Sequence, residues 1–329
     1  MKKYIFLILL FIPLTSFLLN NDQINYLEKK KITKIKINKD FNTFFKDFQK
    51  NFEEKFILRE KIIPINNYLN YKMGFSKDKN LFIGKDGYLF LTNINNITLK
   101  HRGILRDNPK KHREKIKAMK DLIDFFNSKG IKLIFIPVPN QQTIYQEKLP
   151  DWYKFYEESI YDIFGPEFKG KFSENYIDLR KTLKSDPYSY YKYEGHWNSK
   201  GMYLAYNFIM NNITNNIYQF QKEKIYWPKM HLKENFEGVD VIGSKNEYSK
   251  KDTILILGDS FSRPFIRLFK NDFSNVIRID KDHERFEIKR VLSHNPKTVI
   301  IMIVERNFFD YDLLVSGLGN ELNIYKTKN

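Results

Sequence analysis

Three long apolar runs are the feature of the sequence that most restricts how the chain can fold. A strand with one wet face alternates apolar and polar residues, whereas a nearly continuous apolar strand is covered on both faces. Helix-like stretches separate the runs, so the pattern predicts a three-layer α/β domain with a central, mainly parallel sheet. The runs are "IKLIFIPVP" (131–139), "TILIL" (253–257) and "KTVIIMIV" (297–304), and "NVIRID" (275–280) is a further strand candidate.

Two other segments of this region carry clear local signals. An amphipathic helix is expected over about 109–129, because its apolar residues recur three or four positions apart and Gly130 can end it. In "NLFIGKDGYLFLT" (80–92), two β-rich runs flank Asp86 and Gly87. Asp-Gly is a hairpin turn signal, so this segment predicts a β-hairpin.

The region before the main domain has a different pattern. Residues 21–39 are polar and rich in lysine, which predicts a tether. From Asp40 onward, phenylalanines recur at three- and four-residue steps, which predicts a helix that packs this face on the main domain; a cofactor-binding stripe is the alternative. Pro64 is expected to break or end the helix. The stripe consists of Phe41, Phe44, Phe45, Phe48, Phe52 and Phe56.

The N-terminus carries an export signal. Lys2 and Lys3 precede an apolar run from Tyr4 to Leu19, and a positive segment before an apolar core is typical of such signals. The run is slightly shorter than the ~20 residues of a spanning helix. No A-x-A cleavage site follows, so an uncleaved signal anchor is expected, with a cleaved signal peptide as the alternative. The bulk of the chain is then extracytoplasmic, in the periplasm or cell envelope. The expected domains are a signal anchor (1–20), a tether with a helical arm (21–75) and a catalytic domain (76–329).

Composition restricts the partners of the protein. The formal net charge is +17 and the lysines are spread along the whole chain. This charge favours an anionic partner such as an acidic glycan or a lipid surface. No arm or recognition helix concentrates the lysines, so nucleic acid is not expected. The absence of cysteine excludes disulfides, cysteine-ligated zinc and a thiol nucleophile. No histidines and acids cluster at metal-ligand spacing, so no metal site is expected.

The first chemical signal lies in "ILILGDSFSRPF" (254–265). Ligands of a parallel α/β sheet sit at the carboxyl ends of its strands, and Ser260 lies at such an end. Gly258 permits a tight turn, and a helix beginning there would direct free N–H groups towards Ser260, where an oxyanion can be stabilised. The alternative is that Asp259 or Ser260 only caps the helix.

The second chemical signal is "YYKYEGHWNSKG" (190–201). A serine nucleophile needs a base, and the base needs an orienting acid. Glu194 and His196 offer both within one loop, because their spacing lets the carboxylate reach the ring nitrogen that faces away from the serine. The alternative is a structural histidine packed beside Trp197. The other histidines are weaker candidates, since they lie in a charged helix (His112) or in polar stretches (His101, His231, His283 and His294).

Together these signals resemble the alginate O-acetyltransferase family of the AlgX/AlgJ type, whose catalytic domain is SGNH-hydrolase-like. The resemblance covers roughly Asp40 to Asp310 and rests on six blocks in the same order. The family places the acid–histidine pair before the serine, as this chain does, whereas ordinary SGNH hydrolases place it near the C-terminus. The blocks are "FEEKFILRE" (52–60), "GKDGYLFL" (84–91), "PVPNQQTIYQEKLP" (137–150), "EGHWN" (194–198), "GDSF" (258–261) and "VERN" (304–307).

The resemblance implies roles for three residues. Ser260 is the expected nucleophile, His196 the base and Glu194 the orienting acid. The family usually has Asp-x-His, so Glu194 departs from the pattern by one methylene. Either the loop sits slightly back or another acid takes this role.

The resemblance also implies an oxyanion and substrate site. Asn140 follows a predicted strand and is expected to help the serine N–H bind the oxyanion. Arg306 follows another strand and is expected to hold an anionic sugar or to pair with Glu305. Asp259 belongs to this group by position, but it is expected to be structural.

The expected activity is transfer of an acetyl group onto hydroxyls of an extracytoplasmic polysaccharide, acidic or neutral, through an acetyl-serine intermediate. In the family the acetyl group comes through a membrane-bound acyltransferase, so the resemblance implies no soluble cofactor. Two alternatives stay open: a polysaccharide O-acetyl esterase with the same triad, and a non-catalytic glycan-binding or assembly factor.

Overall fold

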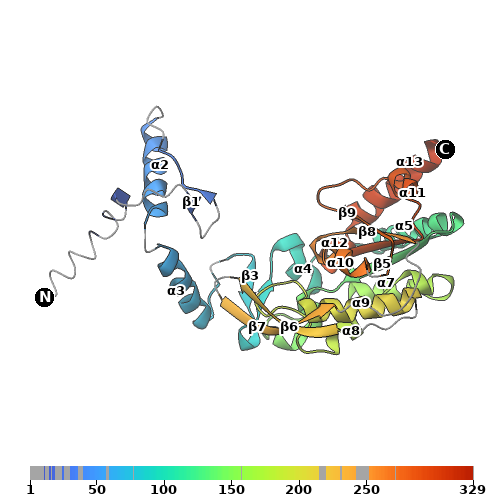
Figure 1. Cartoon of the computed structure of the whole chain (residues 1–329), viewed down its shortest axis with the longest axis horizontal. Helices are drawn as coiled ribbons and strands as arrows, with labels where there is room; N and C mark the ends of the chain where they lie inside the picture. Colours follow the sequence, from blue (N-terminus) through green and yellow to red (C-terminus); the bar gives the residue numbers. More distant parts are fainter. Residues whose placement is uncertain are drawn as a thin grey trace. The chain divides into compact units, whose positions relative to one another are not determined.

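The computed structural model divides the chain into two compact units, residues 1–77 and 78–329 (Figure 1). Apart from Phe11, Thr15, Phe17 and Leu18, the expected anchor at 1–20 lies outside the described residues. No helix within the described part of the chain is long and apolar enough to cross a membrane. The described residues are 11, 15, 17–18, 24–25, 30–35, 40–56, 59–76, 78–156, 158–214, 220–229, 232–241, 252–270 and 272–328.

A parallel sheet of four strands forms the centre of residues 78–329. Its order is β5-β10-β8-β9, and every neighbouring pair is parallel. The register places Val304 beside Val138, and Met302 beside both Ile136 and Gly258. All four expected strands form, so the predicted parallel α/β sheet is confirmed. The strands are β5 (Lys132–Val138), β8 (Thr253–Gly258), β9 (Asn275–Asp280) and β10 (Thr298–Val304).

Apolar side chains alternate between two buried faces of this sheet, and helices cover both. Along β10, Val299 packs with Leu122 of α5 (Pro109–Ser128). The next residue, Ile300, faces the other side, where Tyr206 of α9 (Ser199–Thr214) packs. Helices α5 and α9 therefore lie on opposite faces of the sheet (Figure 1). Burial on both faces explains why β5, β8 and β10 have almost no polar residues, whereas the edge strand β9 has three.

The remaining elements of this unit are short. The predicted hairpin is present as β3 (Leu81–Ile83) and β4 (Leu89–Leu91), and Asp86 and Gly87 have the positive φ angles that its turn requires. The other helices are α4 (Ile97–His101), α6 (Gln141–Ile144), α7 (Ile160–Phe164), α8 (Arg180–Lys184), α10 (Phe265–Phe269), α11 (Ile288–Ser293), α12 (Glu305–Phe308) and α13 (Asn320–Lys328). Tight helical turns span η1 (Lys85–Gly87), η2 (Ile94–Asn96), η3 (Gln146–Lys148), η4 (Gly165–Phe168), η5 (Gly170–Asn175) and η6 (Ser260–Ser262), and a wide turn spans η7 (Asp312–Gly319).

The structure also contains one long hairpin that the sequence pattern does not predict. Strands β6 (Phe220–Lys229) and β7 (Leu232–Val241) pair antiparallel along ten residues each. Pro228 and frequent charged residues disguise this segment in the sequence, because proline and lysine are depleted in strands.

In residues 1–77, the helix expected from the phenylalanine stripe is α2 (Phe41–Glu54). It ends before Phe56, and Pro64 lies inside a separate helix, α3 (Arg59–Lys72), so the expectation that Pro64 ends the stripe helix is wrong. Two short strands, β1 (Ile24–Asn25) and β2 (Lys30–Lys31), pair antiparallel.

The buried side of α2 is polar. Asn51 and Glu54 are buried, and both form hydrogen bonds with the backbone of Thr33. Asn51 Nδ2 donates to the Thr33 carbonyl, and Glu54 Oε2 accepts from the Thr33 N–H. The stripe instead includes exposed rings, and Phe41 is 76% exposed. The expectation that this stripe packs on the main domain concerns contacts between the two units and stays a prediction.

The end of β8 generates a first test. A Cβ atom at Gly258 would lie 2.3 Å from Ser262 Oγ and 2.7 Å from the Met302 carbonyl oxygen, which belongs to the neighbouring strand and cannot move away. We expect Gly258→Ala to lower the free energy of unfolding by about 1–3 kcal/mol through overpacking. Thermal melting measures this change.

Gly165→Ala is the matched control for that substitution. A Cβ atom at Gly165 meets nothing within 4 Å, and its backbone is already helical. Because Pro166 follows and slightly disfavours a helical alanine before it, the melting temperature of Gly165→Ala should fall by less than that of Gly258→Ala. Equal melting of all three proteins would contradict the proposed packing at the end of β8.

Candidate active site

The Gly-Asp-Ser turn follows β8 directly. Ser260 begins the single helical turn η6, and the Asp259 side chain accepts a hydrogen bond from the Phe261 N–H at 3.0 Å. The capping interpretation of Asp259 is therefore correct for this turn. The next helix, α10, begins only at Phe265 and has five residues. The expectation of a helix starting at Ser260 and directing its dipole there is wrong, because only one turn follows the strand.

The two sequence signals meet at this turn. His196 Nε2 lies 2.8 Å from Ser260 Oγ, and His196 Nδ1 lies 2.8 Å from Glu194 Oε1. Ser260 and His196 are 64 residues apart, yet their distance is well inside the roughly 4 Å that apo geometry allows. The carboxylate, imidazole and hydroxyl thus form one continuous hydrogen-bonded chain.

The loop that carries Glu194 and His196 is closed at its base. Tyr190 and Trp197 form an isolated antiparallel bridge, and the Tyr191 N–H donates to the His196 carbonyl at 3.1 Å. The His196 ring stacks on Phe261, with centroids 4.4 Å apart. The alternative of a histidine packed only for structure does not account for its two polar contacts.

Asp259 holds the turn against the central strand. Its Oδ2 accepts the Val304 N–H at 2.8 Å while its Oδ1 accepts the Phe261 N–H, and its side chain is buried. Burial raises the pKa of Asp259 above its usual value, although the two N–H groups act in the opposite direction. These contacts fit the structural part expected for Asp259.

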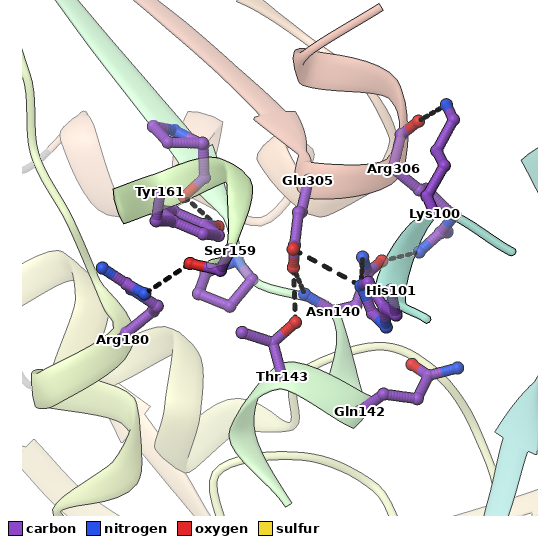
Figure 2. Close-up of polar contacts among 12 residues, drawn as sticks. Lys100, His101, Asn140, Gln142, Thr143, Ser159, Tyr161, Arg180, Glu305 and Arg306 are labelled. Carbon is purple, nitrogen blue, oxygen red and sulfur yellow. Dashed lines mark hydrogen bonds and ion pairs between the residues drawn. The ribbon is translucent and has the colours of Figure 1, made fainter. Parts of the chain in front are cut away.

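Asn140 lies at the end of β5, in a buried polar cluster (Figure 2). Its Oδ1 accepts a hydrogen bond from Arg306 Nη1 at 2.9 Å, and its backbone N–H donates to Glu305 Oε2 at 3.0 Å. Glu305 pairs with His101, whose Nε2 lies 3.4 Å from Oε1. Of the two roles considered for Arg306, pairing with Glu305 is therefore replaced by a hydrogen bond to Asn140.

His101 differs from the expectation drawn from its polar sequence surroundings. Its side chain is buried, its ring stacks on Phe155 at a centroid distance of 4.7 Å, and its Nδ1 lies 3.0 Å from Tyr153 Oη. All of these partners are more than 35 residues away along the chain, so no local pattern marks this histidine.

Arg278 is a further residue that sequence reasoning missed. It donates to the Gly258 and Asp259 carbonyls at 3.1 and 2.8 Å, and to Ser262 Oγ at 2.8 Å. Asp280 pairs with it at 2.9 Å. A charged residue inside "NVIRID" is the one signal that could have drawn attention to it. Arg278 thus holds the backbone before Ser260 and the Ser262 side chain after it.

No three His, Cys, Asp or Glu side chains gather as a metal-binding group in the described part of the molecule.

The contacts of Arg278 generate a second test. Arg278→Ala removes three hydrogen bonds from the turn that carries Ser260, and displacement of a reacting group by about 1 Å costs up to ~100-fold in rate. We expect its reaction with a fluorophosphonate to slow by ~10–100-fold, together with a lower melting temperature. Arg263→Ala is the control, because the Arg263 side chain is 60% exposed and its one ion pair among the described residues is with Asp280 at 3.4 Å. Equal labelling rates for both variants would exclude the role given to Arg278.

Comparisons with known proteins show which family and fold the chain resembles. Residues 81–238 match the family model of the SGNH hydrolase-like domain of acetyltransferase AlgX; this range includes Glu194 and His196 and ends before Ser260. No curated protein sequence matches the chain.

Solved structures share the fold. The O-acetyltransferase domain of Pseudomonas putida AlgJ is 13% identical, with a TM-score of 0.52 over 73% of this chain and 99% of that chain. Bacillus cereus PatB1, solved with a sulfonyl adduct, is 14% identical, with a TM-score of 0.51 over 70% of this chain and 96% of that chain. Residues 81–238 are therefore similar to the SGNH hydrolase-like domain of acetyltransferase AlgX, and the chain shares the fold of the AlgJ domain and of PatB1.

Proposed function

We propose that the protein transfers acetyl groups onto hydroxyls of an extracytoplasmic polysaccharide through an acetyl-serine intermediate. The observation that carries this proposal is the chain of two 2.8 Å contacts from Glu194 through His196 to Ser260. A serine, a base and an orienting acid in this order are the requirement for nucleophilic acyl transfer.

In the first half of the reaction, His196 Nε2 takes the proton of Ser260 as Oγ attacks the acetyl carbonyl. The tetrahedral intermediate collapses, and the donor's leaving oxygen takes the proton from His196. In the second half, His196 takes the proton of a sugar hydroxyl, which attacks the acetyl-serine. The Ser260 oxygen then leaves and regains its proton from His196.

Glu194 is proposed to hold the productive state of His196. Its Oε1 faces Nδ1, so it favours the tautomer that carries hydrogen on Nδ1 and leaves Nε2 free to accept the serine proton. When His196 becomes positively charged during attack, the same carboxylate stabilises the imidazolium. Glu194 is 11% exposed, so water screens this interaction only weakly.

The developing negative charge on the carbonyl oxygen needs donors. The Ser260 N–H and the Asn140 amide are the proposed donors, since both follow strands that flank β10. Arg306 Nε has no hydrogen-bond partner among the described residues, although it is buried. We propose that Arg306 supplies positive charge to this site and to an anionic sugar.

The acceptor and donor are proposed from the charge and the family. A net charge of +17 favours an acidic glycan, although a neutral polysaccharide is also compatible with the triad. A membrane-bound acyltransferase is the proposed source of the acetyl group. An esterase would use the same triad with water as the acceptor, so product analysis distinguishes the two activities.

The proposed location follows from the sequence before the described domain. We propose that residues 1–20 anchor the chain in the inner membrane, that 21–75 form a tether and helical arm, and that 76–329 form the catalytic domain in the periplasm or cell envelope. The +17 charge and the lysine-rich segment after the apolar run also suit an anionic membrane surface.

Four substitutions test the triad. Ser260→Ala and His196→Ala should lower acetyl transfer by ~10⁶-fold. Glu194→Gln should lower it by ~10⁴-fold, because the carboxylate that orients the base is lost. Glu194→Asp should keep a measurable fraction of activity. The assay is acetyl transfer from a chromogenic acetyl ester to a glycan, with thermal melts as the folding control and free acetate as the measure of hydrolysis.

The outcomes separate the possible functions. A glycan-binding factor would not react with a fluorophosphonate or sulfonyl fluoride at Ser260, whereas the proposed enzyme should be labelled there. Full activity of Ser260→Ala would exclude the proposed mechanism. A Glu194→Gln protein as active as the wild type, beside an inactive Ser260→Ala protein, would mean that another acid orients His196.

Cell fractionation tests the location. The full-length chain should sediment with membranes and be released by detergent, because an apolar segment inserted in lipid resists salt washes. Deletion of residues 1–20 is the matched control and should release the protein from the membrane. Recovery of the full-length chain in the soluble cytoplasm would contradict the anchor.

A further inference from the structure

Glu305 is a buried carboxylate that none of the proposed catalytic steps uses. Its side chain is 6% exposed, and it follows β10 directly. Thr143 Oγ1 donates to its Oε2 at 2.6 Å, and the Asn140 N–H donates to the same oxygen at 3.0 Å (Figure 2). A buried charge is costly unless it is paired and hydrogen-bonded. Burial of the Glu305 carboxylate therefore depends on these hydrogen bonds, and the groups that donate them are held in place in turn.

The contacts of Glu305 tie two strand ends together. β10 and β5 are neighbours in register, with Val304 beside Val138. Asn140 and Thr143 belong to the start of α6, which follows β5. Glu305 therefore fixes the backbone that carries the Asn140 side chain, and β10 alone separates β5 from β8, at whose end Ser260 lies.

The Asn140 amide is oriented by a second group. Its Oδ1 accepts from Arg306 Nη1, and a guanidinium can only donate. The amide nitrogen must then occupy the opposite position, where Nδ2 lies 3.3 Å from His101 Nε2. Arg306 thus sets which end of the amide faces His101.

His101 Nε2 has two competing neighbours. It lies 3.3 Å from Asn140 Nδ2 and 3.4 Å from Glu305 Oε1. A ring nitrogen without hydrogen can accept from Asn140, whereas a ring nitrogen with hydrogen can donate to Glu305, and it cannot do both. His101 Nδ1 has Tyr153 Oη as its partner in either state.

We propose that Glu305 and His101 are positioning residues that present the Asn140 amide to the carbonyl oxygen of the acetyl group, an inference that rests on the proposed acetyl transfer. With hydrogen on Nε2, His101 donates to Glu305 and leaves both Asn140 amide hydrogens available to substrate. Without it, His101 accepts one of those hydrogens and withdraws it from the site. The proton on His101 thereby controls an oxyanion donor without touching the substrate.

The surroundings of the pair agree with this assignment. Burial alone would raise the pKa of Glu305. The charge of His101 and hydrogen bonds from His101, the Asn140 N–H and Thr143 outweigh this effect, and the pKa of Glu305 lies below its usual value. A charged Glu305 favours the form of His101 that donates to it.

Other groups around His101 belong to several elements. Lys100, next to His101 on α4, is bonded to Asp310 at 2.6 Å and to the Arg306 carbonyl at 3.1 Å. Arg102 lies over the Trp152 ring. Tyr153 comes from the loop after η3, and Glu305 and Arg306 come from α12. Among these, Glu305 is the carboxylate that directly faces the His101 ring.

The test is the kinetics of acetyl transfer from a chromogenic acetyl ester, resolved into kcat and KM. His101→Gln should lower kcat by ~10–100-fold with little change in KM, since a misplaced oxyanion donor affects the attack rather than ground-state binding and costs up to about 100-fold. His283→Gln is the matched control, because His283 is exposed and lies outside this cluster, and it should keep the wild-type kcat and KM.

A double-substitution cycle tests whether His101 acts through Asn140. If it does, the protein with both His101→Gln and Asn140→Ala should be no slower than Asn140→Ala alone. Multiplicative losses, or a His101→Gln protein with the wild-type kcat, would overturn the inference.

Glu305→Gln is a second probe of the same pair. It should lower kcat as His101→Gln does, because the charge that favours hydrogen on His101 Nε2 is lost. If the protein fails to fold by thermal melting, the His101→Gln results decide. Ser260→Ala is run in parallel to separate the two proposals. Full activity of the Ser260→Ala protein would contradict the acetyl-transfer mechanism itself. An inactive Ser260→Ala protein together with an unaffected His101→Gln protein would contradict only the positioning role.

Discussion

The site depends on how the buried Asp259 carboxylate joins two neighbouring strands. One oxygen holds the Phe261 N–H of the nucleophile turn and the other holds the Val304 N–H at the end of β10. The next residue, Glu305, continues this connection to Asn140 at the end of β5. Two carboxylates therefore fix three strand ends relative to one another, and backbone N–H groups are their common partners. Because backbone is held rather than flexible side chains, the proposed attack by Ser260 would need little reorganisation of the site.

The same hydrogen bonds explain how these two carboxylates can be buried. Asp259 accepts hydrogen bonds from two backbone N–H groups. Arg278 donates to the Gly258 and Asp259 carbonyls, so these backbone oxygens of the turn are also hydrogen-bonded. Glu305 has two donors and a histidine. Carboxylates without such partners would be expelled or protonated in an apolar interior. Both carboxylates beside the Ser260 turn thus lie where several hydrogen-bond donors converge.

The fold and the triad could be predicted from sequence because both leave local signals. Continuous apolar runs such as 297–304 mark strands buried on two faces, and the Gly-Asp-Ser turn follows one of them. Arg278, His101 and Glu305 could not be found in this way, since their partners are brought together by strand order. The start of the helix after β8 was also predicted wrongly from local sequence. α10 begins five residues after Ser260, because the tight turn η6 forms first. Periodicity detects faces of elements, but it carries no information about which strand ends become neighbours.

Glu194 shows how backbone placement can absorb a change in side-chain length. The Tyr190–Trp197 bridge and the Tyr191 to His196 hydrogen bond fix the loop at both ends, so its depth is not free to follow the acid. A Cβ atom at Gly195 would lie 2.9 Å from Leu91 Cδ1, so the loop already packs closely on β4. With the backbone held there, the longer glutamate reaches His196 Nδ1 at 2.8 Å. A shorter aspartate in the same loop must leave that contact longer or pull the loop from β4. The extra methylene is therefore compensated by where the loop is anchored, and the acid and the loop have to change together.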